Sequence, residues 1–378
     1  MPQIQINEER LISLFKELCL IDAPALEEKE SVSYTKKLLE GIGLEVTEDS
    51  AGQKIGGNAN NLIVKLKGNK TGAPTIYLSA HFDTVEPTAG LQIIERDGVF
   101  YSDGTTILGA DDKAGMAPAI EAVRCLMESP DAEYGDVYLL LSVAEEIGLK
   151  GAGALDIQSL GLDYGYVLDT GPPVGTFVNR TATHDKLDIR IIGKPAHAGK
   201  HPEEGINAIE VASKAIAGMT LGRVGPETTA NLGIISGGTG TNVVCAEVNI
   251  KAEARSTVVE DLDRQVGHMV QRFEEAAREA GAQVEIKHVR HYMSYHVGEE
   301  TPVVQVAQRA ARNLGFSGDL RTTLGGSDAN IYNVKGVPSI VVATGMDKIH
   351  THEEYVSIKD LVDVTRLSIE LILEAAKD

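Results

Sequence analysis

The chain has 378 residues, and its 35 Lys and Arg stand against 55 Asp and Glu, which gives a formal net charge of −20. At roughly 150 residues per domain this length predicts two or three packed units, while the negative charge disfavours nucleic acid and membranes as partners. A hydrophobic share of 43% excludes a disordered chain, and since the three cysteines are scattered and no targeting or membrane-spanning stretch is apparent, we expect a soluble protein of the cytoplasm.

Short apolar runs alternate with helical patterns along most of the chain. Apolar residues recur at helical spacing in 8–20, 31–43, 114–129 and 358–377. Apolar runs that end in polar or small residues, as buried strands do, lie at 61–68, 75–83, 136–146, 164–169 and 338–345. This alternation predicts an α/β domain with a mostly parallel mixed sheet that is covered by helices.

The middle of the chain has a different pattern. Polar and apolar residues alternate there, as in strands with one solvated face, in 184–194, 230–238, 243–256 and 282–290. Two helical patterns, 205–219 and 259–281, interrupt these strands. We therefore expect an α+β domain at 180–294, inserted into a domain formed by 1–179 and 295–378.

Acidic and histidine side chains follow the predicted strands at the points where the strands end. They are His81 and Asp83, Glu145 and Glu146, Asp169, and His350, together with Asp111 and Asp112 ahead of a helix. Each motif alone has an ordinary explanation, such as a helix N-cap for the paired aspartates. Because ligands of an open α/β sheet bind at the carboxyl ends of its strands, we expect these side chains to converge on one site.

Two histidines and several carboxylates without cysteine are suited to Zn²⁺, Mn²⁺ or Co²⁺ with coordination positions open to water. The carboxylates exceed what one zinc needs, which predicts two metals and a carboxylate that bridges them. The adjacent Glu145 and Glu146 then indicate a division of labour, in which one binds metal and the other remains free as a general base.

The motifs SAHFDTV, GADDKAG, AEEIG, LDTG and IHTHEEY, in this order, resemble those of the co-catalytic metallopeptidases that include peptidase T, carboxypeptidase G and succinyl-diaminopimelate desuccinylase. The stretch YSDGTTILGADDKAG is most similar to peptidase T and its close relatives. The resemblance covers essentially the whole chain. It implies a zinc-exopeptidase-like catalytic domain that binds the metals, and a ferredoxin-like inserted domain that serves as lid and dimerisation domain.

The resemblance also implies roles for the residues of the metal site. Asp111 would bridge two metals, His81 and Asp169 would bind one of them, Glu146 and His350 the other, Glu145 would be the general base and Asp83 would orient His81. His352 qualifies as well as His350 from its place in IHTHEEY. Family members place a glutamate about four residues after the ligand histidine, and Glu354 stands at that distance from His350, which favours His350.

Further candidates come from the insert and from a later turn. GKPAHAGKHPEEGINAI resembles the family's lid motif, whose histidine, here His197, reaches an active site, often that of the partner subunit, and stabilises the oxyanion. Arg255 stands where relatives hold a substrate carboxylate. Asn242 in GGTGTN, with Gly326 and Ser327 in GGSD, resembles residues that contact the substrate backbone.

The expected activity is that of a two-metal exopeptidase that hydrolyses short peptides with a metal-bridging water. Asp at position 169 accompanies aminopeptidases in this family, which favours a tripeptidase-like aminopeptidase. The resemblance further implies a homodimer formed through the inserted domain. The lid motif is closer to the deacylase and carboxypeptidase pattern, so an N-acyl amino acid amidohydrolase or carboxypeptidase stays open. A catalytically inactive metal-binding scaffold is the alternative from another class, and the complete set of ligands and base argues against it.

Overall fold

The computed structural model describes residues 4–377 of the chain. These residues form two compact units. The first contains the chain up to Arg180, His296–Thr322 and the chain from Ser327 onward, and the second contains Thr181–Tyr295 and Thr323–Gly326. The roles of catalytic domain and lid, expected for 1–179 with 295–378 and for 180–294, stay predictions, and residues 1–3 and 378 lie outside the described part.

The first unit is built from helices α1 (Glu8–Leu20), α2 (Lys29–Gly41), α3 (Ala51–Ile55), α4 (Ala110–Met127), α5 (Lys150–Ala154), α8 (Pro302–Asn313), α9 (Asp328–Val334) and α10 (Ile358–Ala375). Its large sheet contains β1 (Glu45–Glu48), β2 (Leu62–Leu66), β3 (Ile76–His81), β6 (Val137–Ser142), β7 (Tyr164–Thr170), β8 (Phe177–Arg180), β14 (Leu320–Thr322) and β15 (Ser339–Ala343). A small sheet contains β4 (Ile93–Arg96), β5 (Val99–Ser102) and β16 (Tyr355–Ser357).

The large sheet has the strand order β1-β2-β6-β3-β7-β15-β8-β14. Its centre is parallel, because β3 pairs in parallel with β6 and β7, and β7 pairs in parallel with β15. Strands β1, β2 and β8 introduce antiparallel pairs nearer the edges. The predicted α/β fold with a mixed sheet is confirmed.

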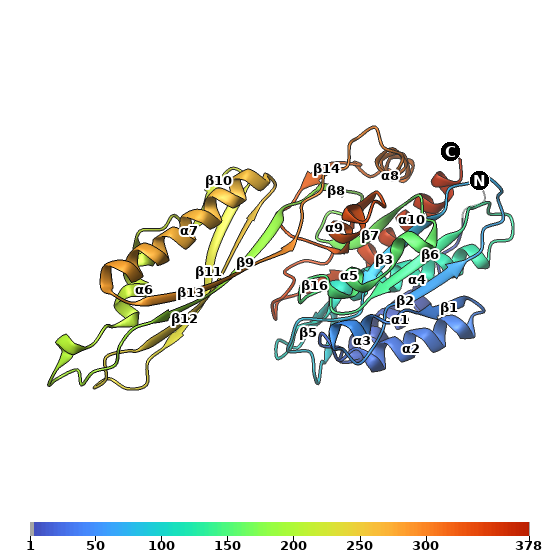
Figure 1. Cartoon of the computed structure of the whole chain (residues 1–378). Coiled ribbons are helices and arrows are strands. Elements are labelled where there is room, and N and C mark those ends of the chain that lie inside the picture. Colours follow the sequence, from blue (N-terminus) through green and yellow to red (C-terminus); the bar gives the residue numbers. More distant parts are fainter. Residues whose placement is uncertain (1–3, 378) are drawn as a thin grey trace. The chain divides into compact units, whose positions relative to one another are not determined.

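Helices cover both faces of this sheet (Figure 1). Every residue of β3 is buried, which requires a layer on each side. On one face the ring of Tyr77 packs edge-on against Tyr332 of α9, with ring centroids 5.4 Å apart. Helices α4 and α10 contact each other and β3. The near-continuous apolar strands of the sequence are therefore the two-sided core of this unit.

The second unit is an antiparallel sheet with two helices on one face (Figure 1). Its elements are β9 (Thr183–Ile192), α6 (Ala208–Ala217), β10 (Gly222–Gly225), β11 (Thr228–Gly237), β12 (Glu247–Ser256), α7 (Val259–Ala280) and β13 (Gln283–Tyr292). The strand order β10-β11-β12-β9-β13 places β9 and β12 in the middle. Apart from the short β10, the order of elements and strands is that of a ferredoxin-like βαββαβ fold.

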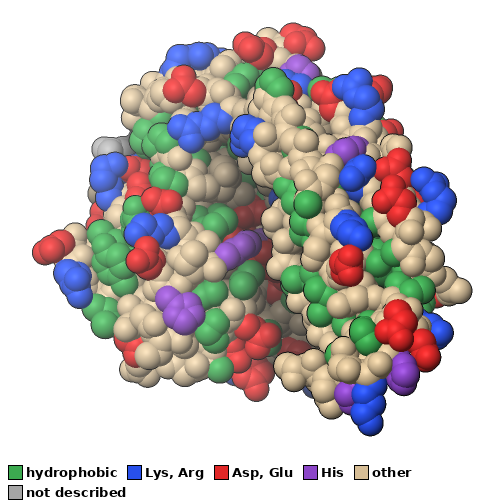
Figure 2. All heavy atoms as spheres, turned by 90° about the vertical axis from the view of Figure 1, so that its left-hand side faces the viewer, with side chains coloured by type: hydrophobic (Ala, Val, Ile, Leu, Met, Phe, Trp, Pro, Cys, Tyr) green, Lys and Arg blue, Asp and Glu red, His purple; other side chains and the backbone are tan. Residues whose placement is uncertain are grey.

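Basic and acidic side chains are interspersed over the face of the molecule that Figure 2 draws. Among the exposed ion pairs of the protein, Arg190 contacts Glu247 at 2.6 Å and Glu285 at 3.2 Å. Pairs of this kind contribute little stability in water. Within residues 4–377, none of the helices has the length and apolar composition needed to cross a bilayer.

Candidate metal centre

The predicted ligands lie at one edge of the large sheet. Strand β3 ends at His81, β7 ends just after Asp169, and the turn that holds Glu145 and Glu146 follows β6. His350 lies in the loop after β15. Because these four strands run in parallel at the centre of the sheet, their carboxyl ends meet at the same edge.

Asp111, in the first turn of α4, lies between two imidazoles. Its Oδ1 is 3.1 Å from Nε2 of His81, and its Oδ2 is 3.2 Å from Nε2 of His350. Glu146 Oε1 lies 2.9 Å from the same nitrogen of His350. The Asp111 carboxylate thus has one oxygen toward each histidine, which is the arrangement that a bridging ligand requires.

The ligand atoms form two overlapping groups, and His81 belongs to both. Atoms of His81, Asp111 and Glu146 lie within 4.8 Å of one another, and so do atoms of His81, Asp112 and Asp169. Asp112 was not assigned a role from the sequence, although GADDKAG offers two adjacent acids. Its Oδ2 accepts a hydrogen bond from the His81 amide at 3.2 Å, and its buried Oδ1 has no partner among the described residues.

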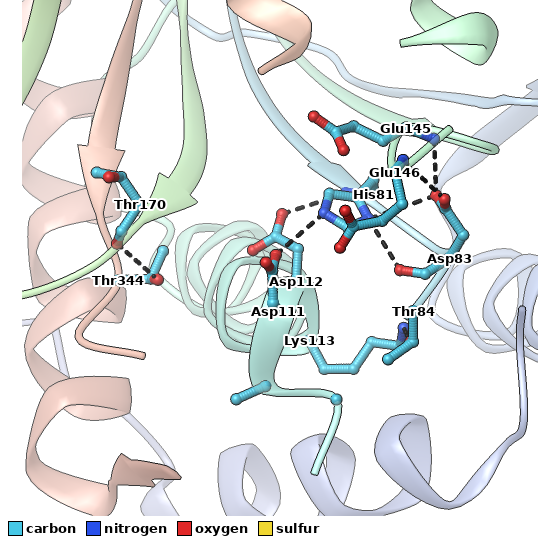
Figure 3. A network of polar contacts seen from close by, with 12 residues as sticks. His81, Asp83, Thr84, Asp111, Asp112, Lys113, Glu145, Glu146, Thr170 and Thr344 are labelled. Atoms are coloured by element: carbon cyan, nitrogen blue, oxygen red, sulfur yellow. Dashed lines mark hydrogen bonds and ion pairs between the residues drawn. The ribbon is translucent and has the colours of Figure 1, made fainter. Parts of the chain in front are cut away.

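Asp83 contacts both His81 and the turn that holds Glu145 and Glu146 (Figure 3). Its carbonyl oxygen lies 2.9 Å and its Oδ1 3.4 Å from Nδ1 of His81, so it sets the direction of that ring. The same carboxylate accepts hydrogen bonds from the amides of Glu145 and Glu146, at 2.9 and 3.0 Å. A fully buried carboxylate with these partners fixes the Glu145–Glu146 turn relative to His81.

Burial dominates the ionisation of three acids in the centre. It raises the pKa of Asp112, Glu145 and Asp169 well above their ordinary values, and neighbouring carboxylates raise each of them further. So many buried acids in one place repel one another when they are ionised. Cations that offset this charge would stabilise the ionised form of the cluster.

The pKa values of Asp111 and His350, which contact each other, shift in opposite directions. Burial alone would raise the pKa of Asp111, but hydrogen bonds from His350 and His81 hold that pKa below its usual range. The carboxylates of Asp111 and Glu146 in turn raise the pKa of His350 to about 10. The protonated imidazole is thus favoured by the negative charge of these two carboxylates.

Lys113 and Gly115 of GADDKAG support the segments that carry the ligands. The buried Lys113 donates to the carbonyl of Phe82 at 2.5 Å and to Oγ1 of Thr84 at 2.7 Å, which fixes the chain on either side of Asp83 (Figure 3). At Gly115 a Cβ would lie 2.2 Å from the carbonyl oxygen of Leu168 and 2.5 Å from Oδ1 of Asp112. Only glycine allows α4 to approach the end of β7 this closely.

The two histidines of IHTHEEY point to different partners. His350 contacts Asp111 and Glu146, whereas Nδ1 of His352 lies 3.0 Å from the carbonyl of Gly104. Glu354, four residues after His350, is fully buried and binds backbone amides at the start of α4. Nothing in the sequence pattern distinguishes such a buried glutamate from the exposed Glu353 beside it.

Ser327 begins α9 in the first unit. Its amide donates to Oδ1 of Asn330 at 3.1 Å, as part of a capping box. The next residue, Asp328, is a buried acid that the sequence did not single out. It hydrogen-bonds Ser142 at the end of β6, and burial raises its pKa to about 6. The GGSD turn therefore also supports the strand that leads to Glu145.

His197 and Asn242 lie on neighbouring loops of the second unit. The amide of Ala198 donates to the carbonyl of Asn242 at 3.0 Å, and His197 faces Val243 in an isolated antiparallel bridge. Both side chains are exposed, and Nδ1 of His197 accepts a hydrogen bond from the Gly199 amide at 3.2 Å. These two predicted residues are thus brought together within their unit.

Arg255 and Gly326 form another group in the second unit. The guanidinium of Arg255 contacts the Glu253 carboxylate through Nε and Nη2, at 3.1 and 3.2 Å, and donates to the carbonyl of Leu324 at 3.3 Å. A Cβ on Gly326 would lie 2.2 Å from the ring of Tyr292. The guanidinium and the 323–326 turn therefore share one site, with Glu253 as a third member that the sequence did not reveal.

The side chains of the first unit suit two divalent cations. Imidazole and carboxylate are ligands of zinc, manganese and cobalt, and no cysteine is needed. Asp111 offers one oxygen to each of two groups, and the unpartnered Oδ1 of Asp112 is a buried acceptor beside one of them. The residues present thus fit the metals that the motifs predict.

Replacing Gly115 by Ala should destabilise the protein, because the added methyl group would push α4 away from Leu168 and Asp112. Overpacking of this kind costs about 1–3 kcal/mol in the free energy of unfolding, to be measured by urea denaturation. The control is Gly153→Ala in α5, where a Cβ meets no atom within 4 Å. Equal effects of the two substitutions would contradict this role of Gly115.

The chain is similar to known peptidases over most of its length. Residues 77–374 match the model of peptidase family M20/M25/M40. The protein YqjE of Bacillus subtilis (strain 168) is 43% identical over 372 residues, which are 98% of this chain and 100% of that protein. The crystal structure of aminopeptidase PepT from Bacillus cereus ATCC 10987 is 42% identical with a TM-score of 0.88, over 98% of this chain and 99% of that one.

A second solved structure is similar over its full length. It is a tripeptidase from Staphylococcus aureus subsp. aureus mu50, 40% identical with a TM-score of 0.93, and the match covers 99% of this chain and 100% of that one. The family match spans every residue of the metal centre, from His81 to His350. The resemblance seen in the motifs is confirmed: the chain belongs to peptidase family M20/M25/M40 and is a metal-dependent hydrolase of peptide bonds.

Proposed function

We propose that this peptidase removes the N-terminal residue of short peptides, tripeptides among them, at a centre that holds two metals. The observation that carries the proposal is the position of Asp111, whose two oxygens face His81 and His350 at 3.1 and 3.2 Å. The similar structures from Bacillus cereus and Staphylococcus aureus, an aminopeptidase and a tripeptidase, support this choice of substrate.

In this proposal Asp111 would be shared by both metals, His81 and Asp169 would hold one of them, and Glu146 and His350 would hold the other. Asp112, whose carboxylate lies within 4.8 Å of His81 and Asp169, supports the first side. Two zinc ions, or manganese or cobalt in their place, would lower the pKa of a water toward about 7 and polarise the scissile carbonyl.

Glu145 is the general base of the proposed reaction. Its backbone is fixed by Asp83, while the neighbouring Glu146 turns toward His350. One acid of the pair thus remains available to accept a proton from the attacking water and to pass it to the leaving amine. Asp83 keeps both the turn and the ring of His81 in place while this happens.

The second unit would supply the contacts that choose the substrate. His197, exposed on its loop, stabilises the oxyanion, in this subunit or in its partner. Arg255 holds a substrate carboxylate with its planar guanidinium. Asn242 and Gly326, together with Ser327 of the first unit, contact the peptide backbone. The pairing of Arg255 with Glu253 supports this assignment, because it holds the guanidinium in one orientation before substrate arrives.

Glu145→Gln should bind metal as the wild type does but lose activity, because the amide cannot take up the proton of the water. General-base catalysis contributes about 10²–10⁴-fold, so kcat should fall by that factor while metal content, measured by atomic emission, stays the same. Glu45→Gln on the exposed strand β1 is the control and should leave kcat unchanged. Normal turnover by the Glu145 variant would refute its assignment as base.

A panel of peptides tests the direction of cleavage. A free tripeptide should be hydrolysed in the presence of Zn²⁺, Mn²⁺ or Co²⁺, and its C-amidated form more slowly, because amidation removes the carboxylate that Arg255 would hold. The N-acetylated form should not be hydrolysed, because an aminopeptidase needs the free amino group. Products are identified by mass spectrometry. Cleavage of the acetylated peptide alone would favour an N-acyl amino acid amidohydrolase. Release of the C-terminal residue would favour a carboxypeptidase, and binding of metal without any turnover an inactive scaffold.

We further propose that two copies associate through the outer edge of β11. This strand pairs with β12 along its whole length but with β10 only as far as Ala230. Beyond that point no described strand covers its edge, where Ile234 and Ile235 are 56% and 57% exposed. Two such edges can pair with each other about a two-fold axis, and a second copy therefore fits this surface.

Ile234→Lys should separate the dimer, because a charged side chain at an edge strand opposes pairing. Light scattering after size exclusion should give twice 40.3 kDa for the wild type and 40.3 kDa for the variant. Val289→Lys, on the opposite edge strand β13 and 38% exposed, should remain dimeric. A monomeric wild type, or dissociation by the Val289 variant alone, would contradict this interface.

The state of the cysteines bears on the compartment. Cys19, Cys125 and Cys245 are all buried and form no disulfide. Free buried thiols are typical of proteins in reducing surroundings, and we accordingly place this peptidase in the cytoplasm.

A further inference from the structure

Glu354 links the loop that holds His350 to the start of α4. It is fully buried, and its side chain binds three consecutive amides. Oε2 accepts hydrogen bonds from Gly109 and Ala110, at 2.6 and 3.2 Å, and Oε1 accepts one from Asp111 at 3.0 Å. One carboxylate therefore satisfies the backbone donors that lead to and include the central acid of the metal centre.

The start of α4 needs an acceptor of this kind. The first amides of a helix have no partner within the helix and carry partial positive charge, so a carboxylate placed there is favourable. Here the need is greater, because Asp111 and Asp112 have backbone angles outside the helical range, with ψ of 105° and 36°. Without Glu354, the amides of residues 109–111 would be buried and unpaired.

Backbone hydrogen bonds join the two ends of the loop that carries His350 and Glu354. The amides of Asp347 and Tyr355 each donate to the other residue's carbonyl, at 3.0 and 3.1 Å, and the amide of Glu354 donates to the carbonyl of Thr351 at 3.1 Å. His350 lies inside this closed loop, and its Nε2 is 3.2 Å from Oδ2 of Asp111. The loop thus contacts Asp111 twice. His350 contacts the side chain of Asp111, and Glu354 binds its backbone amide.

We propose that Glu354 is a positioning residue that sets the distance between Asp111 and His350, and thereby the affinity of the metal that these two share with Glu146. The inference rests on the two-metal centre proposed above. Residues that orient metal ligands in this way change metal affinity by about 10–100-fold when they are replaced. The other metal would also bind Asp111, but its further ligands His81 and Asp169 do not contact Glu354. Asp83 and Lys113 support that side of the centre, so the affinity of this metal should change little.

The test is a calorimetric titration of Zn²⁺ into the full-length, chelator-treated protein. The wild type should bind two equivalents. Glu354→Gln keeps the size of the side chain but replaces one acceptor oxygen by a donor that faces the amides. It should weaken one site about 10–100-fold and leave the other within a factor of three. Glu353→Gln, which alters the exposed neighbour paired with Lys348, should titrate as the wild type.

The weakened site is identified in the background His350→Ala, where Glu354→Gln should produce little additional loss if both act on the same metal. Unchanged binding by Glu354→Gln, equal weakening of both sites, or additive losses would each overturn the inference. If Glu354→Gln does not fold, Glu354→Asp, which keeps the charge, is titrated and judged by the same outcomes. A wild type that binds no zinc would refute the two-metal centre itself, a result distinct from any of these.

Discussion

The structure of the candidate metal centre depends on one constraint, which is that the carboxylate of Asp111 lies between two imidazoles with an oxygen toward each. This places a buried anion where burial alone would make it costly, and only the surrounding cations, His⁺ or metal, compensate for that cost. The parallel strands at the middle of the sheet meet the constraint, because their carboxyl ends bring His81 and Asp169 to one edge while α4 presents Asp111 to the same place.

Carboxylates that bind backbone amides hold this arrangement together. Asp83 fixes the turn of Glu145 and Glu146, and Glu354 fixes the start of α4. Asp83 accepts hydrogen bonds from two amides and Glu354 from three, which irregular turns would otherwise leave unpaired. The backbone of the site is therefore set by charged hydrogen bonds as well as by regular secondary structure. Gly115 then allows α4 to lie directly against the end of β7. The proposed metal ligands are accordingly positioned from several separate parts of the chain.

Much of this architecture could be predicted from the sequence. The apolar runs ending in polar residues predicted both the strands and their convergence, because strand direction and the position of a ligand crevice follow from general rules of α/β sheets. Asp112, Asp328 and Glu354 could not be assigned in this way, since their roles depend on which buried oxygen faces which amide or hydroxyl. The same is true of Glu253 beside Arg255, whose contact arises from side-chain geometry within one strand. Periodicity identifies faces of elements, whereas hydrogen-bond partners across the fold appear only in three dimensions.

The most direct test of the account is a crystal structure of the zinc-loaded protein with anomalous diffraction measured at the zinc edge. The account predicts two peaks about 3.5–4 Å apart, one beside His81 and one beside His350, with one oxygen of Asp111 bound to each. A single peak, or two peaks of which only one contacts Asp111, would contradict it.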